Sequence, residues 1–170
     1  MSTPITLDEI LAPAYVADLA AQSDTRLSEM AEHARALETE VSYLRRLAQG
    51  RIDILVAEQE RRAAGGSIGD LIAALPKILA GNETRPPATT ARVPIQLAPE
   101  GDLRWHDGLE TLVADDTLAN LPVLTDTDLA SALVRLREFE GELSGTRRKL
   151  HGVIDNIELE LANRQQHATE

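Results

Sequence analysis

Two long stretches of the sequence carry apolar residues at every seventh position, and this spacing constrains the fold more than any other feature. The first stretch repeats Leu27, Ala34, Val41, Ala48 and Leu55, with Met30, Leu37 and Leu44 between them. The second repeats Leu129, Leu136, Leu143, Leu150 and Ile157. A seven-residue apolar repeat forms the seam of a coiled coil. We therefore predict an all-α protein in which two long helices form an intramolecular coiled-coil hairpin, with short flanking helices.

Turn and cap signals divide the chain around these helices. The run "AAGGS" at 63–67 is expected to end the first helix, and Thr125 with Asp128 three residues later is typical of a helix start. Residues 67–80 predict a brief apolar helix containing Pro76, and a short helix is expected around "DGLETLVA". The predicted units are an N-terminal amphipathic segment (1–22), the first coiled-coil helix (23–64), a connector with short helices and a Pro-rich linker (65–124), the second coiled-coil helix (125–165) and a polar tail (166–170).

Composition excludes several classes of protein. The net charge of −11 over 170 residues argues against binding along a nucleic-acid backbone and fits a protein partner with a basic surface. The absence of cysteine excludes disulfides and Cys-based zinc sites. The N-terminus has no basic signal-peptide region, and no apolar run approaches the length of a membrane span. We expect a cytoplasmic protein with no direct contact to DNA or membrane.

The polar residues of the two long helices repeat more faithfully than the apolar ones. The sixteen residues "ETEVSYLRRLAQGRID" from Glu38 match "EGELSGTRRKLHGVID" from Glu140, 102 positions later, at eight positions. The seam meanwhile exchanges residues, for example Ala34 against Leu136. The chain therefore holds two copies of one helix, separated by a connector.

Five of the repeated polar positions share one face of each helix. At about 100° per residue they fall within an arc of about 80°, in a row about 20 Å long that flanks the seam. The first row is Glu38, Ser42, Arg45, Gln49 and Asp53, and the second is Glu140, Ser144, Arg147, His151 and Asp155. We call these ten residues the polar stripes. Pairing of the helices is expected to form a polar groove beside the seam.

The residue types in the polar stripes suit guanine and phosphate groups. Arg donates paired hydrogen bonds to guanine O6 and N7 or to phosphate oxygens, and a carboxylate accepts from guanine N1–H and N2–H. A second arginine, Arg46 or Arg148, adds positive charge beside each stripe. Gly50 and Gly152 occupy equivalent places, where a missing Cβ would let a flat ligand or a neighbouring backbone come close.

A simpler interpretation of the same residues stays open. Glu and Arg at helical spacing usually form a solvated face with weak ion pairs, and duplication of a hairpin gives similarity without a ligand. The alternative function is a ligand-free coiled-coil scaffold or oligomerisation module. The stripes differ at only one of five positions, which favours a binding site. His33, His106 and His167 lack metal-ligand spacing and are interpreted as surface histidines, and no motif indicates catalysis.

At these residues the sequence resembles the RsiG-type anti-sigma factors of actinobacteria. The signature of that family is Glu-x3-Ser-x2-Arg-x3-Gln-x3-Asp on each of two coiled-coil helices. The first stripe matches it completely, and the second has His151 where a Gln would stand. A neutral His can still donate and accept hydrogen bonds, so binding need not be lost, but the two halves need not behave alike and the second could be mildly sensitive to pH.

The resemblance implies a regulatory binding protein that is not an enzyme. Such a protein binds a cyclic di-GMP dimer on its coiled coil, about two nucleotides per chain, and sequesters a WhiG-type sigma factor so that its promoters are silenced. The connector is long enough for either helix orientation, but an antiparallel pairing would match a two-fold ligand dimer. Residues 6–20 and 67–80 are candidates for sigma contact or for helices that fold back onto the hairpin.

Overall fold

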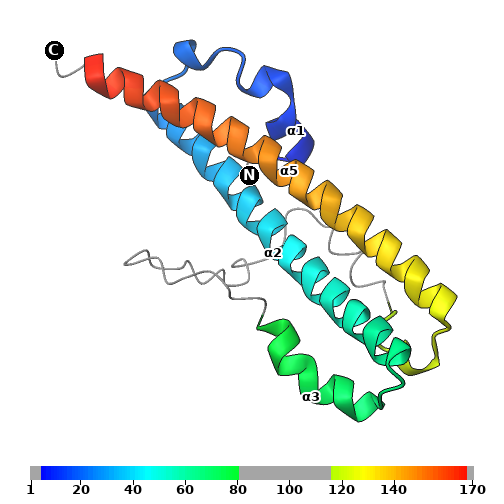
Figure 1. Ribbon diagram of the computed structural model, residues 1–170. Coiled ribbons are helices and arrows are strands. Elements are labelled where there is room, and N and C mark those ends of the chain that lie inside the picture. Colours follow the sequence, from blue (N-terminus) through cyan, green and yellow to red (C-terminus); the bar gives the residue numbers. More distant parts are fainter. Residues whose placement is uncertain (1–4, 81–115, 168–170) are drawn as a thin grey trace.

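The computed structural model describes residues 5–80 and 116–167, and over these ranges the chain is helical without strands (Figure 1). Two long helices, α2 (Asp24–Ala63) and α5 (Asp126–His167), run side by side in opposite directions. The shorter elements are α1 (Leu7–Leu11), α3 (Ile68–Leu79) and the 3-10 turns η1 (Pro13–Tyr15), η2 (Leu19–Ala21) and η3 (Leu121–Val123). The predicted antiparallel hairpin with short flanking helices is confirmed.

The ends of the long helices follow the cap signals in the sequence. Thr125 Oγ1 accepts a hydrogen bond from Asp128 N at 3.1 Å, and the Asp128 carboxylate accepts from Thr125 N at 3.4 Å, as predicted. Ser23 caps α2 in a similar way, with its Oγ accepting from Arg26 N at 3.2 Å. At the other end of α2, Gly65 has a φ of +68° and lets the chain turn toward α3.

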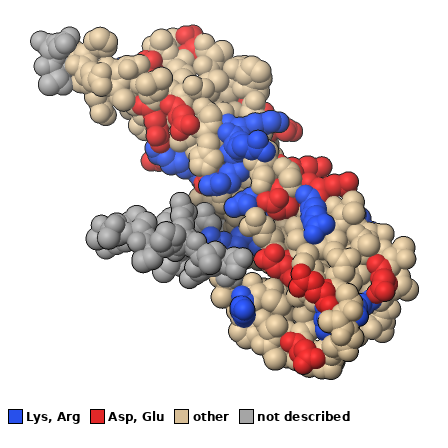
Figure 2. Space-filling model, viewed as in Figure 1, with Lys and Arg blue, Asp and Glu red and all other residues tan. Residues whose placement is uncertain are grey.

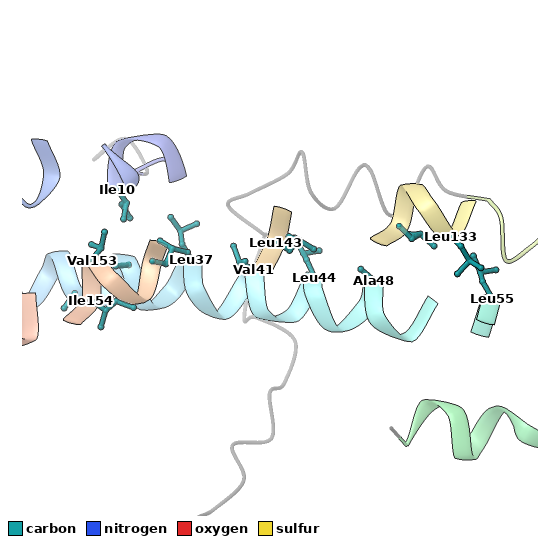
Figure 3. Packing of buried hydrophobic residues seen from close by; sticks show 14 of the residues in the cluster. Ile10, Leu37, Val41, Leu44, Ala48, Leu55, Leu133, Leu143, Val153 and Ile154 are labelled. Atoms are coloured by element: carbon teal, nitrogen blue, oxygen red, sulfur yellow. The ribbon is translucent and has the colours of Figure 1, made fainter. Parts of the chain in front are cut away.

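The seam between α2 and α5 forms the core (Figure 3). Every residue predicted for the seam is buried, and Leu44, Leu55, Leu143 and Leu150 have no exposed surface. Full burial of a Leu side chain contributes about 1.5–3 kcal/mol to folding. The apolar seven-residue repeat is therefore what holds the hairpin together.

The N-terminal segment covers one side of the hairpin. Ile10 of α1 is fully buried, and it points toward Leu37, Val153 and Ile154 (Figure 3). The Tyr15 hydroxyl donates to Met30 O at 3.2 Å, which ties the same segment to α2. This segment therefore folds back onto the hairpin in the isolated chain.

Helix α3 packs along α2, near the turn that follows it (Figure 1). Its N-terminus carries a capping box formed by Ser67 and Asp70, and Leu71 is its only buried residue. Pro76 lies inside the helix as predicted, whereas Ile72 and Leu79 remain exposed. The predicted Pro-rich linker of the connector, His106 and the predicted helix around "DGLETLVA" lie outside the described residues. No helix within the described ranges is long and apolar enough to cross a membrane.

Candidate functional site

The antiparallel pairing brings eight of the ten polar-stripe residues into two small clusters across the α2–α5 interface. The first cluster is centred on Glu38. Its Oε1 accepts from Ser42 Oγ at 2.7 Å, on the same helix, and from Arg147 Nε at 2.8 Å, on the opposite helix. Arg147 Nε also lies 2.9 Å from Ser42 Oγ, and His151 Nε2 lies 3.3 Å from Glu38 Oε1.

The second cluster repeats the first with the helices exchanged. Glu140 Oε1 accepts from Ser144 Oγ at 2.8 Å, within α5. From α2, Arg45 Nη1 donates to the same oxygen at 3.2 Å, and Gln49 Nε2 lies 3.4 Å away. Each glutamate thus takes a serine from its own helix and an arginine from the other. A pseudo-two-fold axis between the helices relates the two clusters.

Partial burial strengthens the electrostatics of the first cluster. Burial of Glu38 raises the pKa of its carboxyl, but the hydrogen bonds from Ser42 and Arg147 and the charge of Arg147 outweigh it, so this pKa lies below its ordinary value. Glu38 is therefore a carboxylate at neutral pH. In the second cluster, the Nε of Arg45 is buried and has no hydrogen-bond partner within the described residues. The clusters are consequently ordered, charged and incompletely satisfied.

The two aspartates at the ends of the stripes stand apart. Asp53 and Asp155 are exposed, and neither makes a hydrogen bond or ion pair within the ranges that the structure describes. Asp53 lines a groove of about 820 Å³ between α2 and α3, together with Glu60, Arg61 and Lys77. Within the described residues the stripes therefore form two clusters of four residues, and both aspartates are exposed.

Gly50 and Gly152 both have space around them in the structure. A Cβ built on Gly50 would meet only the side chain of Leu79, at 3.7 Å, and one built on Gly152 would have nothing within 4 Å. Among the described residues no backbone approaches either glycine closely. Of the two alternatives at these positions, the close approach of a neighbouring backbone is not found among the described residues, and the approach of a flat ligand stays a prediction.

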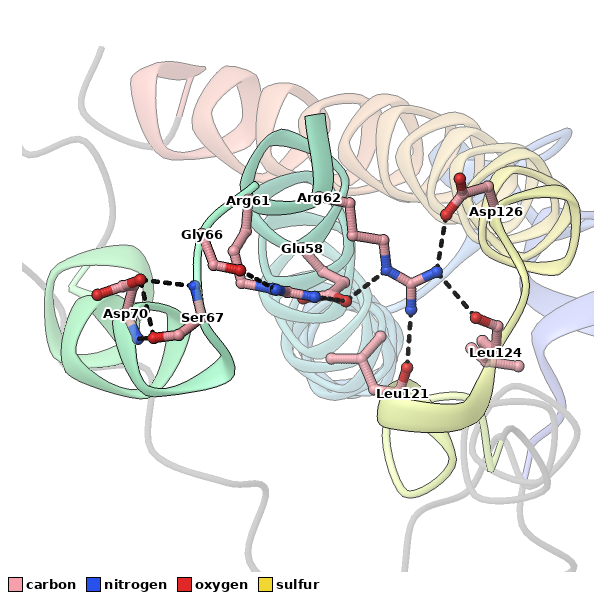
Figure 4. Close-up of polar contacts among 9 residues, drawn as sticks. All are labelled: Glu58, Arg61, Arg62, Gly66, Ser67, Asp70, Leu121, Leu124 and Asp126. Atoms are coloured by element: carbon pink, nitrogen blue, oxygen red, sulfur yellow. Dashed lines mark hydrogen bonds and ion pairs between the residues drawn. The ribbon is translucent and has the colours of Figure 1, made fainter. Parts of the chain in front are cut away.

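A third polar cluster, which sequence reasoning missed, closes the turn end of the hairpin (Figure 4). Glu58 is fully buried and is held by Arg61 and Arg62 of its own helix. Arg62 also reaches across to α5, where its Nη1 donates to Asp126 Oδ1 and to Leu124 O, both at 2.8 Å. Its Nη2 donates to Leu121 O at 3.0 Å. One guanidinium thus joins the end of α2 to the start of α5.

The opposite end of the hairpin has the same construction. Arg164 of α5 contacts Glu160 of its own helix at 2.7 Å and Asp24 at the start of α2 at 2.8 Å. Its remaining bonds go to the backbone oxygens of Leu19, Ala20 and Gln22. Arg62 and Arg164 are 102 positions apart, as are Asp24 and Asp126, and η2 and η3. The internal repeat therefore extends over both complete halves of the hairpin, and that constant offset is the signal that would have revealed these clusters.

Two of the isolated histidines, His33 and His167, lie within the described residues. His33 is only partly exposed, with its Nδ1 buried and unpartnered within the described residues, whereas His167 is exposed as expected. No group of three His, Asp or Glu side chains in the described ranges is arranged to hold a metal ion.

Comparison with known proteins identifies the family. A search of curated proteins found no match. The model of the RsiG-like family matches residues 13–79 and 115–170, which include both long helices, both polar stripes and the two end clusters. These residues make up more than half of the chain, so the protein belongs to the RsiG-like family of anti-sigma factors.

Proposed function

We propose that this anti-sigma factor binds a dimer of cyclic di-GMP on its polar stripes and, in that form, sequesters a WhiG-type sigma factor. The observation that carries the proposal is the meeting of the two stripes across one interface, with an arginine of each helix against a glutamate of the other. A two-fold ligand dimer requires a site with matching symmetry. The antiparallel hairpin offers that symmetry within one chain.

The groups in each cluster suit the two polar edges of guanine. Arg45 and Arg147 can donate to O6 and N7, and Glu38 and Glu140 can accept from N1–H and N2–H. In the structure these arginines and glutamates form ion pairs with one another, so binding exchanges internal ion pairs for contacts with the nucleotide. Because the side chains are already held in place, little further ordering is needed for binding.

The surface of the protein fits a basic partner. The net charge is −11, and on the visible face Lys and Arg gather near the middle of the molecule while acidic groups are scattered around them and toward both ends (Figure 2). Sigma factors carry basic surfaces for DNA, and complementary charge favours encounter with such a partner. We expect the protein to act in the cytoplasm, where sigma factors meet RNA polymerase.

A second candidate function, a ligand-free coiled-coil scaffold, is favoured by one observation. The stripe residues already pair with each other, at distances of 2.7 to 3.4 Å, without any ligand. A scaffold would use these bonds only to fix the register of the helices. The two functions differ in what the arginines are needed for, and this difference can be measured.

The test uses size-exclusion chromatography to measure whether the protein forms a complex with a purified WhiG-type sigma factor, with and without cyclic di-GMP. We expect a complex that depends on the nucleotide, and we expect the double variant Arg45→Ala, Arg147→Ala to lose it. Arg135→Ala is the matched control, because Arg135 is exposed on α5 and lies about 140° around the helix from Glu140. A complex that forms equally well without nucleotide and with the double variant would refute the proposed role of the stripes.

A further inference from the structure

The polar stripes alone have the wrong net charge for an anionic ligand. They contain four carboxylates and two guanidinium groups, and each guanidinium is already paired with a glutamate of the opposite helix. Each cyclic di-GMP molecule carries two phosphodiester groups, so a nucleotide dimer brings several negative charges. The negative charges of the phosphodiesters would repel the carboxylates of the stripes at close range. A site of this kind needs further cations close to the stripes.

Arg46 and Arg148 are placed to supply this charge. Arg46 follows Ser42 by four residues and precedes Gln49 by three, so it lies on neighbouring turns of the same helix face. Arg148 stands in the same relation to the second stripe, and its Nε donates to Ser144 O at 3.3 Å. That bond holds the guanidinium beside the second stripe.

Both arginines are available to a ligand. They are exposed, and within the described residues neither forms an ion pair with a carboxylate. By contrast, Arg45, Arg62, Arg147 and Arg164 all have carboxylate partners. With Arg46 and Arg148 included, the site would contain four guanidinium groups, equal in number to its four carboxylates.

Both halves of the internal repeat have an arginine at this position, Arg46 and Arg148, although neighbouring positions differ between the halves. The next position holds Leu47 in the first half and Lys149 in the second, and the position before Arg45 holds Leu44 against Thr146. An exposed arginine without a partner has no packing role that would keep it in both halves. A shared ligand contact accounts for its presence in each.

We propose that Arg46 and Arg148 are the phosphate-binding residues of the site, each contacting a phosphodiester of the bound nucleotide. This inference rests on the proposed function and adds a division of labour to it. The inner arginines, Arg45 and Arg147, stand against the glutamates and face the guanine bases. The outer arginines neutralise the phosphates and supply the dependence of affinity on salt.

The test is calorimetric titration of the full chain with cyclic di-GMP at two salt concentrations. The chains compared are the wild type, Arg46→Ala, Arg148→Ala, their double variant, Arg46→Lys and the control Arg135→Ala. We expect each alanine variant to lose roughly tenfold in affinity and the double variant to lose more. The double variant should also depend less on salt, Arg46→Lys should retain most of the affinity, and Arg135→Ala should match the wild type.

The outcomes separate this inference from the function on which it rests. Binding by the wild type with an unchanged affinity and salt dependence in the double variant would overturn the phosphate role and leave the proposed function intact. If the folded wild type does not bind the nucleotide, both fail. Because the two side chains are exposed, the helical content and melting temperature of the variants should match the wild type and serve as the check on folding.

Discussion

Glu58 is a fully buried carboxylate, and its two arginine neighbours explain how α2 can hold it inside the turn end of the hairpin. The hydrogen bonds from Arg61 outweigh the effect of burial, and with those from Arg62 they lower the pKa of Glu58 to about 2. The folded state therefore binds the proton at Glu58 more weakly than the unfolded chain does. At this residue, a charge and its partners stabilise the fold only while the carboxyl is ionised.

This lowered pKa predicts acid sensitivity. The stabilisation is complete above the ordinary carboxyl pKa of about 4.5 and is lost as the pH falls from there toward about 2. Urea unfolding at several pH values between 7 and 3 should show a falling free energy of unfolding. Glu58→Gln should cost roughly 1–3 kcal/mol at pH 7 and should flatten this dependence. An unchanged slope in Glu58→Gln would contradict the role assigned to Glu58.

At the scale of helices, burial along the seam decides how α2 and α5 pair. Leu143 is fully buried between the two helices, whereas Val134, on the same helix, is 52% exposed. The seven-residue repeat predicted this difference, because Leu143 belongs to the repeat and Val134 does not. Residues on the same helix can therefore be matched as test and control.

Truncation of these two residues should have very different costs. We expect Leu143→Ala to reduce the free energy of unfolding by about 2–4 kcal/mol, because it removes buried apolar surface and leaves a cavity. Val134→Ala should change it by less than about 0.5 kcal/mol. Denaturant unfolding followed by circular dichroism measures both. Equal effects of the two substitutions would mean that the seam is not the main source of stability.

At the scale of helices, features set by local sequence spacing could be predicted, and contacts between distant positions could not. Seam burial and the Thr125 cap follow from local spacing, so the sequence predicted them directly. The bonds from Arg62 to the backbone near η3 join positions about sixty residues apart, and no local pattern reports such a pair. The partners of the stripe residues were likewise unknown until the helices were known to be antiparallel. In the sequence, only the constant offset of 102 residues relates positions that lie this far apart.

For the whole molecule, the pseudo-two-fold symmetry and the departures from it within the described residues matter most. The stripes, the seam and the end clusters all repeat in the two halves. Helix α3 breaks the symmetry, because it packs on α2 and the described residues contain no helix at the equivalent place on α5 (Figure 1). The end of the first stripe therefore lies beside α3, because a Cβ on Gly50 would meet Leu79 and Asp53 lines the groove between α2 and α3. His151 in place of a glutamine adds a second difference between the halves.

The measurement that tests the central claim most directly is the stoichiometry of cyclic di-GMP binding to the full chain by isothermal titration calorimetry. Two stripes that meet across one interface predict about two nucleotides per chain, with binding lost in Arg45→Ala and in Arg147→Ala while both variants remain helical. Absence of binding by a folded wild-type chain, both alone and with a WhiG-type sigma factor present, would contradict the account and leave the ligand-free scaffold as the explanation of the repeated stripes.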